Sequence, residues 1–284
     1  MGRYLIFIVC LAPFCLNSSA QGNRPTLEQI KQFKKTTTLV VLDGRDIAFD
    51  AMLNESIRKY WTITPYEIIN AERFEKMKTN SAFSFLILTK TVFDRDRLET
   101  QYGFLNLILA HPTGDINAMP VITYIPFCGD RSTISQNLYK TGMLIKAIQY
   151  QVNQTIQNPK SIRKQLSAFN RNIPELKGKT LLFSVDDLQA EIADSTFLRK
   201  KFKNKIKLVS SDELEKIVIS GKENFVALHK VTPREGSING RCYKMLIDIK
   251  NGTIYYYNMN RISSRNPGKL LRKDIRKIKW YPFY

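Results

Sequence analysis

The stretch YEIINAERFEK, residues 66–76, recurs in pattern 140 residues later as IKLVSSDELEK, residues 206–216, without a gap. Each stretch combines an apolar strand pattern, a polar capping position and a short amphipathic helix pattern. At the same offset, FLILTK at 85–90 matches FVALHK at 225–230. Because helix and strand patterns coincide in phase, this spacing predicts a tandem duplication in which each copy buries an equivalent face.

Outward from this repeat, both copies show the same series of elements. In the first copy we expect strands at 38–43, 66–70 and 83–88, a hairpin at 105–110 and 121–127, and helices at 49–61, near 74–77 and from 135. In the second we expect strands at 180–185, 205–210 and 225–231, a hairpin at 243–249 and 253–258, and helices at 188–202, 211–220 and 269–279. The predicted fold class is α/β, with two tandem copies of a β-α-β-α-β-β-β-α unit.

The polarity of the strands predicts their order in each sheet. The first and third strands are apolar on both faces, as central strands are, and the second is partly polar. We therefore expect the order 2-1-3, with the hairpin extending one edge of a mixed sheet and helices on both faces. This order resembles that of the N-terminal α/β domain of TolB-type and CsgG-type envelope proteins, and the residues that carry the resemblance are Val40–Asp43 and Phe85–Leu88. The whole chain also resembles uncharacterised exported proteins of Gram-negative bacteria, which implies a location but no activity.

The N-terminus has the pattern of an export signal. Arg3 is followed by an apolar run at 4–16 and by the small residues 18–20, so we expect residues 1–20 to be a signal peptide cleaved after Ala20. The alternative is an uncleaved membrane anchor. We then expect a first α/β unit at 21–156, a linker at 157–179 and a second unit at 180–284. The predicted location is exported, either periplasmic or secreted.

Two cysteines, Cys128 and Cys242, lie beyond the predicted signal. Export exposes a chain to oxidising conditions, so a disulfide between them is one alternative. It would join the two copies at neighbouring hairpin corners. Two separate buried thiols are the other alternative. His111 lies close enough in sequence to act as a base for Cys128, but no third orienting group accompanies them, and His229 has the position of a structural residue.

Positive charge is concentrated in the second copy. Residues 1–158 carry 17 basic and 13 acidic side chains, and residues 159–284 carry 27 and 12, so the net charges are +4 and +15. Two groups of residues are candidates for binding an anionic partner: Arg199, Lys200, Lys201, Lys203 and Lys205, and on the last helix Lys269, Arg272, Lys273, Arg276 and Lys277. The alternative is a solvated basic surface with Leu271 and Ile278 facing inward.

Aspartates after the first strand offer a weaker, catalytic interpretation. Asp43, Asp46 and Asp50 follow that strand, and Asp94 and Asp96 follow the third, where ligands gather in parallel sheets. Carboxylates of this kind hold Mg²⁺ for phosphoryl chemistry. Helix capping and turn formation are the structural alternative. The chain lacks the glycine-rich, phosphate-loop and nucleophile-elbow motifs, so we expect no cofactor.

Together these patterns predict an exported, non-enzymatic binding or adaptor protein of the bacterial cell envelope. Its expected partner is an envelope protein or an anionic lipid or polysaccharide surface, because export separates the chain from nucleic acid. The alternative function is a metal-dependent hydrolase or phosphatase that uses Asp43 and Asp46.

Overall fold

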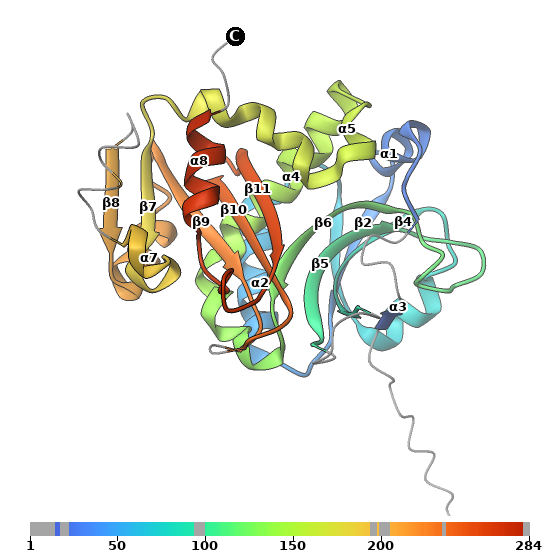
Figure 1. The fold of residues 1–284 in the computed structure, drawn as a ribbon. Coiled ribbons are helices and arrows are strands. Elements are labelled where there is room, and N and C mark those ends of the chain that lie inside the picture. Colours follow the sequence, from blue (N-terminus) through green and yellow to red (C-terminus); the bar gives the residue numbers. More distant parts are fainter. Residues whose placement is uncertain are drawn as a thin grey trace, which may run out of the picture.

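The computed structural model describes residues 15–17, 23–93, 100–193, 198, 205–234 and 237–280. Figure 1 shows two sheets side by side with helices around and between them. The first sheet has the order β3-β2-β4-β5-β6, with β1 paired to the end of β4. Its strands are β1 (Cys15–Asn17), β2 (Thr37–Leu42), β3 (Tyr66–Asn70), β4 (Phe83–Val92), β5 (Tyr102–Leu109) and β6 (Val121–Cys128).

The first unit places helices on both faces of this sheet, as predicted. Its helices are α1 (Leu27–Phe33), α2 (Ile47–Tyr60), α3 (Ala71–Met77) and α4 (Thr141–Gln157), with short 3-10 segments η1 (Arg131–Thr133) and η2 (Ser135–Lys140). On one face, Phe74 of α3 packs edge-on against Phe85, with ring centres 4.9 Å apart. On the other face, Trp61 at the end of α2 donates to Thr64, whose hydroxyl bonds Thr38 at 2.6 Å.

The second sheet repeats this topology. Its order is β8-β7-β9-β10-β11, which matches β3-β2-β4-β5-β6 strand for strand, with β7 parallel to both neighbours and the hairpin antiparallel. The elements are β7 (Thr180–Ser184), β8 (Lys205–Val209), α7 (Ser211–Ser220), β9 (Phe225–Val231), β10 (Arg241–Asp248), β11 (Ile254–Arg261) and α8 (Arg272–Trp280). The mixed α/β fold in two tandem units and the predicted strand order 2-1-3 are therefore confirmed.

Hydrogen bonds show how closely the copies correspond. Asn70 accepts from the backbone N of Arg73, and Ser210 accepts from that of Glu213, so the caps of α3 and α7 are 140 residues apart. The third strands correspond at a different offset. The carbonyl of Phe83 accepts from Ala110, and the carbonyl of Phe225 accepts from Ile249. Phe225 therefore corresponds to Phe83 and not to Phe85, an offset of 142.

The physical reason for this shift is the length of the preceding helix. The helix α7 has ten residues and α3 has seven, so the chain reaches the third strand two residues later in the second copy. The gapless match of 85–90 with 225–230 is wrong in register, although both segments occupy the same place in their sheets.

The helix predicted at 188–202 is wrong for residues 188–193, whereas Leu198 is helical. The chain instead forms two 3-10 turns, η4 (Val185–Asp187) and η5 (Ala190–Ile192). Gln189 donates its backbone N–H to Leu270, and Leu270 donates to Asp187, so these groups pair with the segment before α8. Those bonds replace the i to i−4 bonds of a helix. Residues 194–197 and 199–204 lie outside the described part.

The segment expected as a linker is ordered against the second sheet. It contains α5 (Ser161–Lys164) and η3 (Gln165–Leu176). The side chain of Asn170 donates to the carbonyl of Tyr257 and accepts from its N–H, and Asn172 donates to the carbonyl of Ile254. These amides form hydrogen bonds with backbone N–H and C=O groups of the edge strand β11, as a neighbouring strand would. Likewise, the helix expected from Ser135 begins as η2 and becomes α-helical at Thr141.

The two units share one hydrophobic core. A single cluster of buried residues runs from Ile30 of the first unit to Ile254 of the second, and a smaller cluster lies under α8. Phe104 and Tyr243 occupy equivalent hairpin positions, and their rings meet at 5.6 Å. The equivalent residues Tyr102 and Arg241 are also hydrogen-bonded. The hairpins thus meet like the matching surfaces of a twofold dimer.

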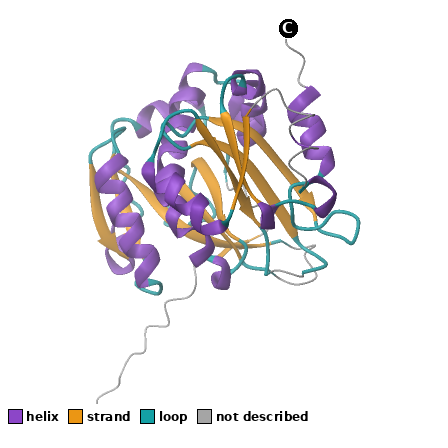
Figure 2. Ribbon diagram, turned by 90° about the vertical axis from the view of Figure 1, so that its left-hand side faces the viewer, coloured by secondary structure: helices purple, strands orange, loops and turns teal. Residues whose placement is uncertain are grey.

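Helices surround the strands on several sides (Figure 2). In the part of the chain that the structure describes, we find no helix with both the length and the apolar character required to cross a bilayer.

Candidate functional site

The helix α8 directs its basic residues away from the sheet. Ile275 and Ile278 are buried, whereas four basic residues are exposed and form what we call the basic face of α8: Arg272, Lys273, Arg276 and Lys277. In Figure 2, α8 is the outer helix that leads to the C-terminus. Lys273 and Lys277 donate to the amide oxygens of Asn266 and Asn258, at 2.7 and 3.2 Å. Because amides carry no charge, these bonds leave the field of the two ammonium groups uncompensated.

The one carboxylate of α8, Asp274, is turned inward and does not neutralise the basic face. Its side chain is fully buried and forms an ion pair with buried Lys244 at 2.5 Å. It also accepts from the Tyr256 hydroxyl, from Asn258 and from the backbone of Leu271. Burial, and then the nearby Asp274 carboxylate, raise the pKa of Tyr256. The pair is fully hydrogen-bonded, which is the condition for a buried ion pair to be tolerated.

The remaining predicted anion-binding residues are only partly described. Arg199, Lys200, Lys201 and Lys203 lie outside the described residues. Lys205 is the first residue of β8, and its backbone pairs with Thr180. Lys269 is predicted on the last helix but lies before α8 begins at Arg272. It is half-buried, and its carbonyl accepts from Lys244 at 3.5 Å. Of the predicted anion-binding residues, those that the structure shows exposed therefore lie on α8.

The aspartates after β2 have structural roles. Asp46 caps α2 by accepting from the backbone N of Phe49, and Asp43 accepts from that of Arg45. Asp50 accepts from Gly44, and burial raises its pKa, assisted by the charges of Asp43 and Asp46. Among the described residues we find no group of three or more histidines, cysteines or carboxylates placed to hold a metal ion. Asp94 and Asp96 lie outside these residues.

Both cysteines are buried thiols and are not bonded to each other in the structure. Burial raises the pKa of Cys128 to about 12 and that of Cys242 to about 11. A thiolate is the nucleophilic form of cysteine, so these pKa values do not favour covalent catalysis. His111, the candidate base, instead bonds Thr113 in its own loop at 2.9 Å.

Where η2 meets the second sheet, the structure gathers titratable side chains whose proximity the sequence did not predict. We call these four residues the junction cluster: Lys140, Asp187, His229 and Lys230. Asp187 and Lys230 are 2.8 Å apart, and Lys140 is 4% exposed. Burial lowers the pKa of Lys140 to about 8, with Asp187 opposing and Lys230 assisting this shift. His229 bonds the Pro126 carbonyl at 2.7 Å through Nε2, and its Nδ1 has no partner among the described residues.

The sequence predicts that the side chain of Asp274 is buried, but it gives no indication that Lys140 is buried. Asp274 lies on the same helical stripe as Leu271, Ile275 and Ile278, a spacing that predicts an inward side chain. Lys140 follows Tyr139 in a polar stretch, and no apolar periodicity marks it for burial. Its position depends on contact with residues that come some fifty and ninety positions later in the chain.

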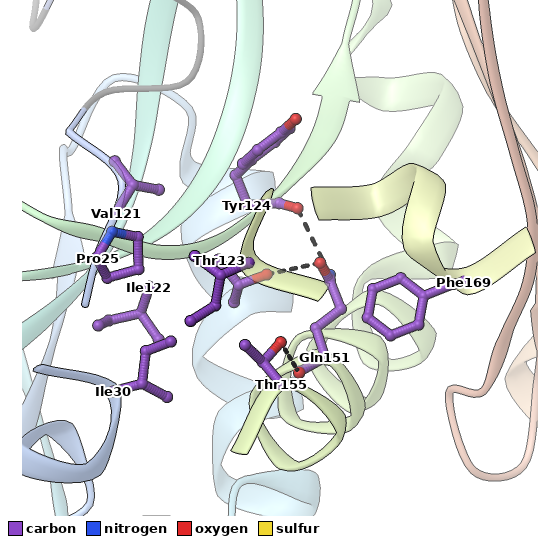
Figure 3. Close-up of a pocket in the computed structure, with 10 residues that line it drawn as sticks. Pro25, Ile30, Val121, Ile122, Thr123, Tyr124, Gln151, Thr155 and Phe169 are labelled. Carbon is purple, nitrogen blue, oxygen red and sulfur yellow. Dashed lines mark hydrogen bonds between the residues drawn. The ribbon is translucent and has the colours of Figure 1, made fainter. Parts of the chain in front are cut away.

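One cavity in the first unit is too small to bind a ligand. Figure 3 shows a cavity near α1, β6 and α4, in which Gln151 accepts from Thr123 at 2.6 Å. Its volume is about 30 Å³, which is room for one water molecule. Apolar side chains, among them Ile30, Ile122 and Phe169, line much of it.

Comparison of the chain with protein-family models, with curated proteins and with solved structures finds no match in any of the three.

Proposed function

We propose that this protein is an exported, non-enzymatic binding or adaptor protein of the bacterial cell envelope that engages an anionic partner through its second unit. The observation that carries the proposal is the basic face of α8. Its four cations point outward, and the one carboxylate of the helix is used inside the fold. An envelope protein with an acidic surface, an anionic lipid surface and an acidic polysaccharide share the negative charge that such a face attracts.

Two further observations support a binding role over an enzymatic one. The oxygens of Asp43 and Asp46 accept from backbone N–H groups, so they complete local structure. The two thiols have raised pKa values. Export remains a proposal that rests on the signal-like residues 1–20.

A vesicle co-sedimentation assay tests the proposal. The purified chain is mixed with vesicles of phosphatidylcholine alone or with phosphatidylglycerol added, over a series of salt concentrations. We expect binding only to the anionic vesicles, with an affinity that falls as salt shortens the range of the attraction. Binding that is insensitive to salt, or equal for both vesicle types, would contradict an electrostatic surface.

A matched pair of double variants locates the surface. Lys273→Gln with Lys277→Gln removes two charges one helical turn apart on α8. As the control, Lys31→Gln with Lys35→Gln removes two exposed charges with the same spacing in sequence, one on α1 and one just after its end. Each basic side chain near an anionic surface contributes about 1 kcal/mol, so the α8 variant should bind about thirtyfold more weakly. Equal losses in both variants would show that overall charge, and not α8, is responsible.

A further inference from the structure

A polar groove lies on the side of α4, between the end of α2 and the turn that joins β10 to β11. Its volume is about 410 Å³, which is in the range of sites for small ligands. Both units contribute to its lining, which includes Tyr60, Lys146, Gln149, Asn153, Gln154 and Asn251. No residue of α8 lines it, so the groove is a separate feature from the basic face.

The floor of the groove is held rigidly by two side chains. Gln149 accepts from the backbone N of Thr62 at 2.7 Å and donates to the carbonyl of Tyr60 at 2.7 Å. Lys146 donates to the carbonyl of Ile249 at 2.7 Å, and its ammonium lies 4.4 Å from the centre of the Tyr60 ring. These bonds tie α4 to both neighbouring segments, so the hollow is formed before any ligand arrives.

Two amides on its wall have unused donors with fixed directions. The Oδ1 atom of Asn153 accepts from Lys34 at 2.9 Å, and that of Asn251 accepts from the backbone N of Thr253 at 2.9 Å. Each Nδ2 group has no hydrogen-bond partner within the part of the chain that the structure describes. An amide whose oxygen is already bonded still has two N–H donors to offer. The groove therefore offers donors to a ligand that is rich in acceptors.

Basic side chains outnumber acidic ones around the groove. None of its lining residues is acidic. Burial lowers the pKa of Lys146, and the charges of Lys250 and Lys59 add to this effect while Asp248 opposes it. Lys250 meets Glu223 only at 3.6 Å, with both side chains well exposed, and an exposed pair of this kind is weak. An anionic ligand is therefore favoured over a neutral one.

The groove is also elongated. Its lining positions on α4 run from Lys146 to Gln154, and eight residues of helix span about 12 Å. We propose that this groove binds a short stretch of an acidic oligosaccharide, whose hydroxyl and carboxylate oxygens accept from Asn153 and Asn251. Lys146 in the groove and the nearby Lys59 and Lys250 attract its charge. A single phosphate or carboxylate would occupy only part of this length.

Isothermal titration calorimetry on the full chain at low ionic strength tests the site. The probe is an α-1,4-linked trigalacturonate, and neutral maltotriose and inorganic phosphate are the comparison ligands. Asn153→Asp and Asn251→Asp keep the accepting oxygen and replace the donor with a negative charge. Ser81→Asp adds the same charge at an exposed turn between α3 and β4. Thermal unfolding of each variant checks that it is folded, and Asn153→Asp retains a partner in Lys34.

We expect trigalacturonate to bind the wild type and the Ser81→Asp variant alike, and each Asn→Asp variant about tenfold more weakly, because a repelling oxygen replaces a donor. The Lys273→Gln, Lys277→Gln variant should bind it normally, which separates this site from the basic face of α8. The proposal is overturned if the trisaccharide does not bind, if phosphate or maltotriose binds as tightly, or if the α8 variant loses binding while the Asn→Asp variants keep it.

Discussion

Replacing Lys140 with methionine should stabilise the protein at neutral pH. The Lys140 side chain is 4% exposed, and burial lowers its pKa from 10.5 to about 8. The difference of 2.5 units, at 1.36 kcal/mol for each unit, means that the charged form costs about 3 kcal/mol in the folded state. Methionine has a similar length and no charge, so the Lys140→Met variant avoids this cost.

The same shift predicts a defined pH window. The pKa of Lys140 is lower in the folded than in the unfolded chain, so its contribution destabilises the fold fully below about pH 8 and disappears as the pH rises toward 10.5. The advantage of Lys140→Met should therefore be about 3 kcal/mol at pH 7 and close to zero near pH 10.5. Taking the difference between variant and wild type at each pH removes the contributions of other titrating groups.

Urea unfolding followed by tryptophan fluorescence measures both free energies of unfolding. The control is Lys31→Met, which changes an exposed lysine of α1 and should alter stability little at either pH. An advantage of Lys140→Met that is the same at pH 7 and pH 10.5, or a variant less stable than the wild type at pH 7, would refute the assignment of a costly buried charge to the junction cluster.

Two further substitutions test buried polar groups. Burial lowers the pKa of His229 from 6.5 to about 3, with the Lys140 charge assisting and Asp187 opposing. The wild type therefore loses stability as the pH falls below 6.5. The His229→Gln variant keeps a donor for the Pro126 carbonyl but has no group that titrates there. Denaturant unfolding at pH 7 and 4.5 should show the variant losing about 3 kcal/mol less, and equal losses would contradict this. Lys244→Met leaves Asp274 charged and buried, and it should cost about 3 to 5 kcal/mol in the same assay, much of which Asp274→Asn should restore in the double variant. A double variant as unstable as Lys244→Met alone would show that the unpaired charge is not the cause.

Local pattern was enough to predict the repeating unit and its strand order. The strands around Val40 and Leu86 are apolar on both faces, and both proved central. The polar residues Asn70 and Ser210 come just before helical patterns, and both cap helices. These features depend on neighbours within a few residues, which is why the order of amino acids alone reveals them.

The register of the repeat and the irregular segments were beyond such reasoning. The offset changes from 140 to 142 because α7 is longer than α3, and helix length depends on packing as well as on pattern. Residues 188–193 have helical periodicity, but Gln189 donates its backbone N–H to Leu270, a residue about eighty positions away. The polar segment 165–176 covers β11 because that edge strand needs partners.

The sequence by itself determined the duplicated α/β unit, the excess of positive charge in its second copy and the basic outer side of the last helix, because these follow from composition and short-range periodicity. Only the tertiary structure decided which charges are buried. Lys140 and His229 meet at the junction of the units, and Lys244 meets Asp274 beneath α8. The physical reason is that desolvation depends on which distant segments cover a side chain, and no local pattern records that.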